Sequence, residues 1–255
     1  MFRRRGDVTE NKGTHDLLGI APVGRAVERV TDSIVSGAEA LLARVCLPAA
    51  EEFGQLLRDK VSGWRQRNVL ATVQKAEPMF EAAVTEHRHA ASPRLIMESL
   101  NHASWTESDE VQQMWAGLLA SSCSSDGRDD SNWIFINLLG QLTEMQARFL
   151  KAACEAATKI IQPGGLVAAE SLYRQRDEMI EMTGCVDIQR IDRELDHLRA
   201  LGLIHRGFLS GFAAQPIADV QPTSLALHLY VRAQGSLENP IEYFRLGRTE
   251  TTTSP

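Results

Sequence analysis

The chain has few of the features that mark secreted, membrane-spanning or nucleotide-driven proteins. Its four cysteines, Cys46, Cys123, Cys154 and Cys185, are widely spaced and form no C-x-x-C pair, so no disulfide framework or paired-thiolate metal site is indicated. No stretch approaches the roughly 20 apolar residues that a helix needs to cross a bilayer. No glycine-rich phosphate loop of either common pattern occurs, which argues against a kinase or a nucleotide-driven motor. We therefore expect reduced thiols, a cytoplasmic location, no membrane span and no cofactor.

Basic residues are not in excess either. Lysine and arginine number 27 against 33 aspartates and glutamates, which gives a formal net charge of −6. Proteins that hold the phosphate backbone without sequence preference usually carry a strongly basic surface. We therefore expect a protein partner or a homo-oligomer, while nucleic acid stays open as a partner but is not favoured.

Apolar residues at helical spacing run along most of the sequence. Amphipathic helices are expected over residues 22–45 and 47–76, with Pro78 breaking or restarting the second. The apolar face of the first helix suits a partner helix better than a membrane surface, because its polar face lacks the lysine and arginine richness of a membrane binder.

Helix signals continue up to residue 142. The Ser-Pro pair at 92–93 predicts an N-cap followed by a first-turn proline. Residues 111–119 match the helical template, with Thr106 or Ser108 as the cap. The almost wholly apolar segment 133–142 predicts a short helix that is buried on most sides.

A new unit is expected to start near residue 143. Thr143 with Gln146 three residues later is a capping-box pattern that opens a helix. The QPGG segment at 162–165 predicts a turn, and a helix over 168–182 is expected after it.

The rest of this unit reads as helix, hairpin and helix. The helix over 188–201 ends at Gly202, a favoured residue just after a helix. Residues 203–208 and 212–220 are candidates for a small β-hairpin. Residues 225–233 alternate as a strand does, but Thr223 as a cap and Gly235 as a stop favour a helix.

The predicted fold is mainly α-helical. An N-terminal helical domain at 21–142 is followed by a winged-helix-like domain at 143–236 with a small β-hairpin, because the order of helices and hairpin after residue 143 is that of a winged helix-turn-helix. The charged, apolar-poor ends at 1–20 and 237–255 are predicted to be tails.

One predicted helix carries charges in its apolar stripe. Lys60 falls within the face formed by Phe53, Leu56, Leu57, Val61 and Trp64, and Arg67 lies one heptad beyond Lys60. A buried ammonium without a partner is costly. Lys60 therefore either extends its amine to water along the helix rim or pairs with Asp109 or Glu110.

Three segments, residues 47–76, 97–122 and 135–152, resemble the landmark segments of the Abi-alpha (abortive infection alpha) family, in the family's order and at about its spacing. The resemblance covers roughly residues 40–235. The family's aspartate, lysine and valine followed by aromatic and basic residues resemble Asp59, Lys60, Val61, Trp64 and Arg65. Its acidic run before a tryptophan-bearing helix resembles Asp109, Glu110 and Trp115.

This resemblance implies a bacterial, mainly helical phage-defence protein whose action sacrifices the infected cell or halts its growth. It implies no established active site. We expect an antiviral effector or regulator that is not an enzyme and acts through protein–protein contacts, with interaction or structural roles for the matched residues and Arg67. The alternative is a winged-helix DNA-binding transcriptional regulator.

Sites for chemistry are weak in this sequence. Glu86, His87, His89 and His102 are unfavourable as a metal site, because the two histidines at i and i+2 point to different faces of a helix. The serines around Cys123 have no nucleophile-elbow pattern and no positioned base. A hydrolase that degrades a cellular component therefore ranks last.

The helix over 188–201 is the candidate recognition helix, with Arg190, Arg193, His197 and Arg199 as its candidate DNA contacts. Four acids, Asp187, Asp192, Glu194 and Asp196, accompany the three arginines. Because a DNA reader usually presents a net basic face, a protein-interaction or structural role is favoured for this helix.

Overall fold

The structure, a computed structural model, describes residues 35–58, 63–85, 90–124, 126–209 and 216–247. The described residues from 38 to 247 form one compact unit, and residues 35–37 belong to a second unit. None of the helices in the described ranges is both long and apolar enough to cross a membrane.

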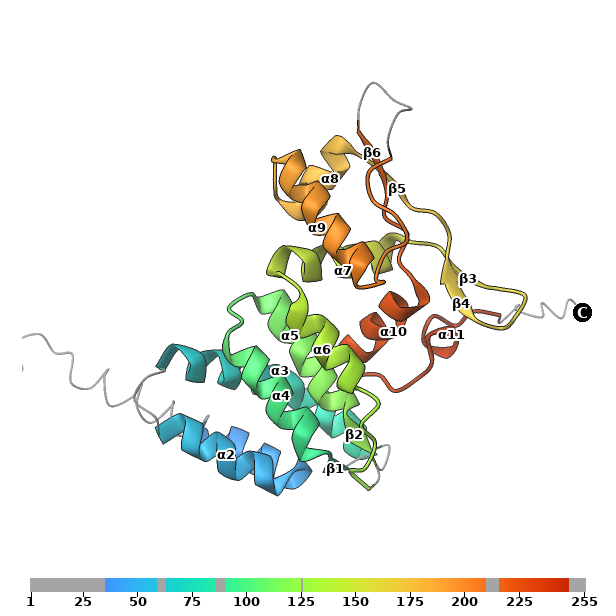
Figure 1. The fold of residues 1–255 in the computed structure, drawn as a ribbon. Helices are drawn as coiled ribbons and strands as arrows, with labels where there is room; N and C mark the ends of the chain where they lie inside the picture. Colours follow the sequence, from blue (N-terminus) through green and yellow to red (C-terminus); the bar gives the residue numbers. More distant parts are fainter. Residues whose placement is uncertain (1–34, 59–62, 86–89, 125, 210–215, 248–255) are drawn as a thin grey trace, which may run out of the picture. The chain divides into compact units, whose positions relative to one another are not determined.

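Helices dominate the first half of the chain (Figure 1). A helix over 35–45 is followed by α2 (Leu47–Arg58), α3 (Gly63–Thr85), α4 (Pro93–Ser104), α5 (Asp109–Ser121) and α6 (Trp133–Gln141). The two-residue strands β1 (Ala90–Ala91) and β2 (Cys123–Ser124) pair antiparallel and join the segment before α4 to the end of α5.

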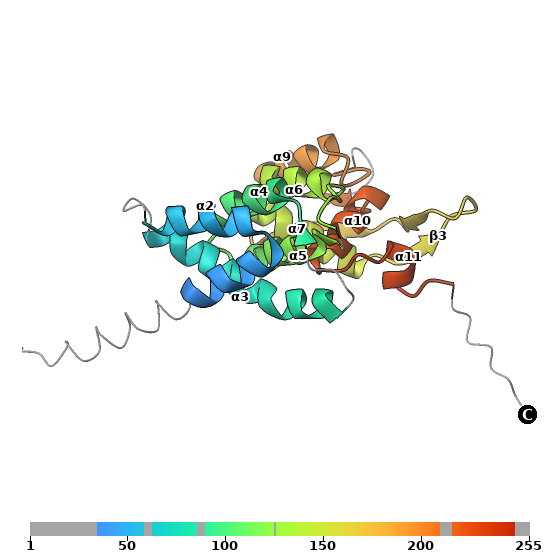
Figure 2. The same cartoon turned by 90° about the horizontal axis from the view of Figure 1, so that it is seen from below.

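The second half mixes helices with short antiparallel strand pairs. Its elements are α7 (Glu144–Ala156), β3 (Lys159–Ile161), β4 (Val167–Ala169), β5 (Tyr173–Gln175), α8 (Arg176–Thr183), α9 (Ile188–Ala200), β6 (Ile217–Asp219), α10 (Ser224–Ala233) and α11 (Pro240–Tyr243). β3 pairs with β4, and β5 pairs with β6. The β3–β4 hairpin extends away from the helices beside α11 (Figures 1 and 2).

α5 is the central helix of this unit. It packs against α3, α4, α7 and α10, and its apolar positions from Val111 to Leu119 are all buried. Gly117 allows the closest approach, because a Cβ there would lie 1.8 Å from the carbonyl oxygen of Ala233 at the end of α10. One cluster of buried apolar side chains therefore continues from α4, α5 and α6 into α7, α9 and α10.

The mainly helical fold that the sequence predicts is confirmed, together with small two-stranded antiparallel sheets. The division at residue 142 stays a prediction. α11 lies within the segment after residue 236 that the sequence assigns to a tail, and its Tyr243 and Phe244 rings contact Tyr230 of α10.

Several predicted helix ends are confirmed. Thr143 and Gln146 form a complete capping box at the start of α7. Thr223 accepts the N–H of Ala226 at the start of α10, so residues 225–233 are helix rather than strand. Gly202, with φ +70°, follows the end of α9.

Part of the predicted hairpin pairing occurs, while residues 212–215 of its second segment lie outside the described residues. Residues Ile204 and Pro222 are bridged antiparallel, as are Phe208 and Ala218. The predicted helix over 22–45 is helical at 35–45, and its earlier part lies outside the described residues.

Three local predictions are wrong. Pro78 does not break α3, which continues to Thr85 and buries Phe80 in the turn after the proline. Packing of that turn compensates for the backbone hydrogen bond that a proline removes.

The predicted helix over 168–182 begins only at Arg176. Val167, Ala168 and Ala169 instead form the buried strand β4, because the turn at 162–165 folds them back onto β3. α6 is buried on one face rather than on most sides: Phe135, Ile136 and Leu139 are buried, whereas Ile134 is 55% exposed.

Candidate functional site

The turn between α4 and α5 is held in one conformation by side-chain hydrogen bonds. The hydroxyl of Thr106 donates to the carbonyl of His102 over 3.2 Å, and the amide of Gln112 donates to the carbonyl of Thr106 over 2.8 Å. Ser108 is the N-cap residue of α5. The turn is therefore bound to the ends of both helices that it connects.

Side chains of α3 form hydrogen bonds with this turn. Arg65 Nε donates to Ser104 Oγ over 3.0 Å, and Asn68 Nδ2 donates to the Ser104 carbonyl over 3.0 Å. About two turns farther along α3, Lys75 Nζ lies 3.0 Å from Gln112 Oε1 and 2.9 Å from Asp109 Oδ1. The two ends of the turn are thus tied to the same helix.

Aromatic and charged side chains gather on the outer face of the turn. The rings of Trp64 and Trp105 lie 5.8 Å apart and are tilted by 58°. The guanidinium of Arg65 lies 4.3 Å from the centre of the Trp105 ring, and the indole N–H of Trp64 donates to Glu107. Trp105 nevertheless stays 60% exposed, which is unusual for so large an apolar side chain.

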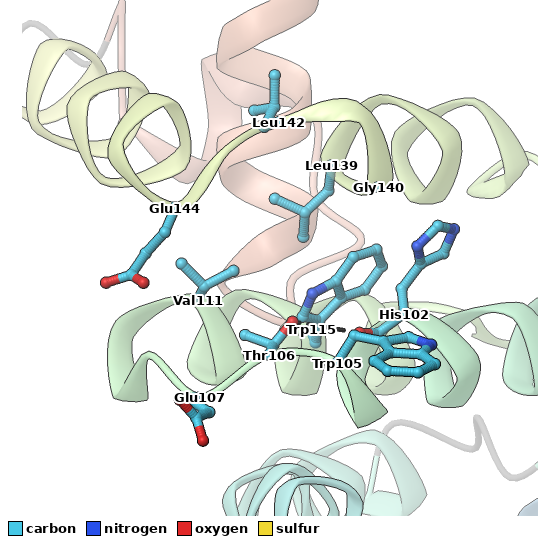
Figure 3. A pocket seen from close by; sticks show the side chains of 10 residues that line it. All are labelled: His102, Trp105, Thr106, Glu107, Val111, Trp115, Leu139, Gly140, Leu142 and Glu144. Atoms are coloured by element: carbon cyan, nitrogen blue, oxygen red, sulfur yellow. Dashed lines mark hydrogen bonds between the residues drawn. The ribbon is translucent and has the colours of Figure 1, made fainter. Parts of the chain in front are cut away.

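A pocket of about 240 Å³ lies on the other side of this turn, between α5 and the junction of α6 with α7 (Figure 3). We call it the tryptophan pocket. It is lined by His102, Trp105, Thr106, Glu107, Val111, Trp115, Leu139, Gly140, Leu142 and Glu144.

The wall at the His102 end of the tryptophan pocket is closely packed. The imidazole of His102 stacks parallel to the Trp115 ring, with centroids 5.2 Å apart, and its Nε2 lies 3.2 Å from Glu98 Oε1. Gly140 makes room for the imidazole, since a Cβ there would approach its Cε1 to 2.5 Å. His102 is thereby fixed against Trp115.

The tryptophan pocket is lined by aromatic, aliphatic and acidic residues. Its charged lining groups are the carboxylates of Glu107 and Glu144, and its aromatic groups are two indoles and one imidazole. Within the described ranges, no group of three or more histidine, cysteine, aspartate or glutamate side chains is placed to hold a metal ion. His87 and His89 lie outside those ranges.

Clear pKa shifts occur elsewhere, where α7 meets α10. Burial raises the pKa of the Cys154 thiol to about 12. Burial, followed by the Glu155 carboxylate, also raises the pKa of Tyr230, whose hydroxyl lies 3.3 Å from Glu155 Oε1. These groups form contacts between α7 and α10. They do not line the tryptophan pocket.

Four residues that the sequence singles out meet at the turn. Trp64 and Arg65 reach it from α3, Asp109 binds Lys75, and Trp115 lines the tryptophan pocket. Arg67 and Glu110 are exposed.

Asp59, Lys60 and Val61 lie outside the described residues, and so does the hypothesised pair of Lys60 with Asp109 or Glu110.

Sequence reasoning missed Trp105 and Glu107. The available signal was a tryptophan placed between two predicted helices, in a segment of otherwise polar residues, where burial in a helix face does not explain it.

In the candidate recognition helix α9, the arginines lie beside acidic residues of the same helix. Arg190 and Arg193 lie 3.9 Å and 3.6 Å from Glu194 Oε1, and Arg199 lies 2.7 Å from Asp196. His197 and Gln146 of α7 are in hydrogen-bond contact at 3.0 Å. The basic groups proposed as DNA contacts are therefore each beside an acid or bound to α7.

Comparison with known proteins gives one match. The family described as abortive infection alpha matches residues 65–234, from Arg65 in α3 to the residue after α10. No curated protein and no solved structure matches the chain significantly.

Proposed function

Because the chain belongs to the abortive infection alpha family, we propose that it is a phage-defence effector or regulator that acts through protein contacts and not as an enzyme. The family points to abortive infection, in which defence comes at the expense of the infected cell. The proposed mode of action depends on the α4–α5 turn.

The observation that carries the proposal is the preorganised exposure of Trp105. Tryptophan and arginine are the residues most enriched among those that dominate protein–protein binding energy. Here Trp64, Arg65 and Trp105 stand together at the surface, and hydrogen bonds to α3 and α5 hold the turn that presents them. A surface that is already ordered loses little side-chain entropy when a partner binds.

A plaque assay with Trp105→Ala tests this proposal. We expect the variant to weaken the partner contact about 10-fold or more and to lose protection, while its free energy of unfolding falls by only about 1 kcal/mol. The matched control is Leu166→Ala, which removes a side chain that is 66% exposed on the β3–β4 hairpin.

Wild type and control should protect at low multiplicity of infection, with collapse of the culture at high multiplicity. Full protection by a stably folded Trp105→Ala protein would contradict the role of this surface.

The alternative function, a winged-helix DNA-binding regulator, is favoured by element order. Apart from the β3–β4 hairpin that lies between α7 and β5, helix α7, strand β5, helices α8 and α9, and the antiparallel segments around 204–208 and 217–222 follow the order of a winged helix-turn-helix. The acids beside Arg190, Arg193 and Arg199 weigh against it. Duplex DNA binding that weakens steeply between low and moderate salt, and that Arg190→Ala weakens further, would favour this alternative.

A further inference from the structure

Trp115 has a hydrogen-bond donor that the fold leaves unused. The residue is only 2% exposed, and no hydrogen bond between described residues uses its Nε1–H. The buried polar atoms that lack a partner in the described ranges are Ser99 Oγ and Asn132 Oδ1, so the Trp115 N–H opens into the pocket and is not sealed in the core. Figure 3 shows the indole nitrogen on the edge of the ring that faces Val111, away from His102. An indole N–H that opens into a pocket can donate to a bound molecule, so the tryptophan pocket is suited to a ligand that carries an acceptor.

The charged groups that line the same pocket are acidic. Glu144 begins α7, with its side chain 55% exposed and 3.9 Å from Arg148, and Glu107 is held by the indole of Trp64. His102 has its Nε2 against Glu98, and Arg65 and Lys75 are bound outside the lining, to Ser104 and Asp109. The tryptophan pocket therefore favours a cation and disfavours a phosphate.

The volume of the pocket limits which ligands it can hold. Sites for drug-sized ligands usually have about 300–1,000 Å³, so about 240 Å³ is better suited to one large amino-acid residue. An arginine residue combines a carbonyl acceptor with a planar guanidinium that binds carboxylates through two parallel hydrogen bonds and rests against indole rings.

We propose that the tryptophan pocket binds an arginine of a partner protein, whose main-chain carbonyl accepts from Trp115 Nε1 while its guanidinium meets Glu144. This inference rests on the proposed function, since it names the chemistry by which a partner reaches the surface around Trp105. Trp105 both lines the pocket and forms the exposed patch, so one partner segment contacts both.

The test is a titration of the 15N-labelled full chain with N-acetyl-L-arginine amide, followed through the tryptophan indole N–H resonances. The chain has four tryptophans, so Trp115 is assigned by elimination with Trp64→Phe, Trp105→Phe and Trp133→Phe, and the core residue itself stays unchanged. N-acetyl-L-citrulline amide, which keeps the shape and the carbonyls but lacks the charge, is the matched control ligand.

We expect a saturable shift of the Trp115 resonance with the arginine amide and about 5-fold weaker binding of the citrulline amide. Glu144→Gln should weaken the arginine amide about 3-fold and leave the citrulline amide unchanged. Glu181→Gln, which neutralises an exposed carboxylate on α8, should change neither.

An absent Trp115 shift, or equal binding of the two amides, would overturn the assignment. So would a Trp115 shift with guanosine in place of the arginine amide, because that result would make the site one for a nucleobase.

The failure of this inference is distinguishable from failure of the proposed function. If Trp105→Ala abolishes protection but the arginine amide does not bind, the contact surface stands and the arginine assignment falls. If the amide binds and the wild type protects against no phage, the pocket stands and the proposed function falls.

Discussion

At the scale of single residues, Cys154 couples protonation to folding. Burial in the α7–α10 contact raises the pKa of its thiol from 9.0 to about 12, whereas the unfolded thiol ionises near the ordinary value. The unfolded chain therefore loses this proton first as pH rises. The contribution to stability is complete below pH 9.0 and is lost as pH rises toward about 12.

We accordingly expect the free energy of unfolding to fall on going from neutral pH to about one unit above the thiol's ordinary pKa, and Cys154→Ala to flatten that fall. Urea unfolding at the two pH values measures it. Cys185→Ala, which removes a half-buried thiol outside the α7–α10 contact, is the matched control for the substitution itself. An equal slope for wild type and Cys154→Ala would show that other groups cause the alkaline loss.

The sequence predicted some residues of the site and missed others. Trp64, Arg65 and Trp115 were singled out because family segments and helix patterns contain them. Trp105 and Glu107 were not, because their importance comes from contacts with α3, which starts some 40 residues earlier: Trp64 with Glu107 and Arg65 with Trp105 are 43 and 40 positions apart. Neither helical periodicity nor local motif spacing records a contact over that separation.

At the scale of elements, the contact of α5 with α10 depends on the missing side chain at Gly117. A Cβ there would lie 1.8 Å from Ala233 O and 2.3 Å from Ala233 C, and backbone atoms do not rotate away as a flexible side chain does. We expect Gly117→Ala to force the helices apart and to lower the free energy of unfolding by more than about 3 kcal/mol.

Chemical denaturation measures this effect. Gly63→Ala is the matched control, because among the described residues a Cβ at the first residue of α3 meets nothing nearer than Arg67 Nη1 at 3.9 Å. Its stability should stay within about 0.5 kcal/mol of wild type. Equal effects of the two substitutions would contradict the close α5–α10 contact.

Elements were predictable where their signals are local. The caps Thr143 and Thr223 and the stop at Gly202 depend on side chains or dihedral angles within a few residues, and each is confirmed. The predictions at Pro78 and at Ala168 were wrong because tertiary packing determines the secondary structure there. Burial of Phe80 carries α3 past its proline, and pairing with β3 makes a strand of an alanine-containing segment that suits a helix equally well.

At the scale of the whole molecule, the buried apolar cluster crosses residue 142 without interruption. α5 loses α7 and α10 if residues 143–255 are removed, which exposes the helix that organises the first half. We therefore expect a chain truncated after residue 142 to aggregate or stay unfolded, and the full chain to unfold in one cooperative transition.

The distribution of aromatic residues makes this measurable. All four tryptophans precede residue 142, and all three tyrosines, Tyr173, Tyr230 and Tyr243, follow it. Tryptophan fluorescence and the NMR signals of incorporated fluorotyrosine thus report on the two halves separately. Coincident midpoints are the expected result. Two separate midpoints would instead favour the independent domains that the sequence predicts.

The absent side chain at position 117 has a consequence for genetics. Every missense change at that codon adds a Cβ where a carbonyl already lies, so selection for cells that lose the defence phenotype will enrich substitutions there. Such mutants will look like contact-site mutants although Gly117 is buried against α10. Only measured protein abundance separates them from changes at Trp105, so each such allele needs an immunoblot before it is assigned to the proposed partner surface.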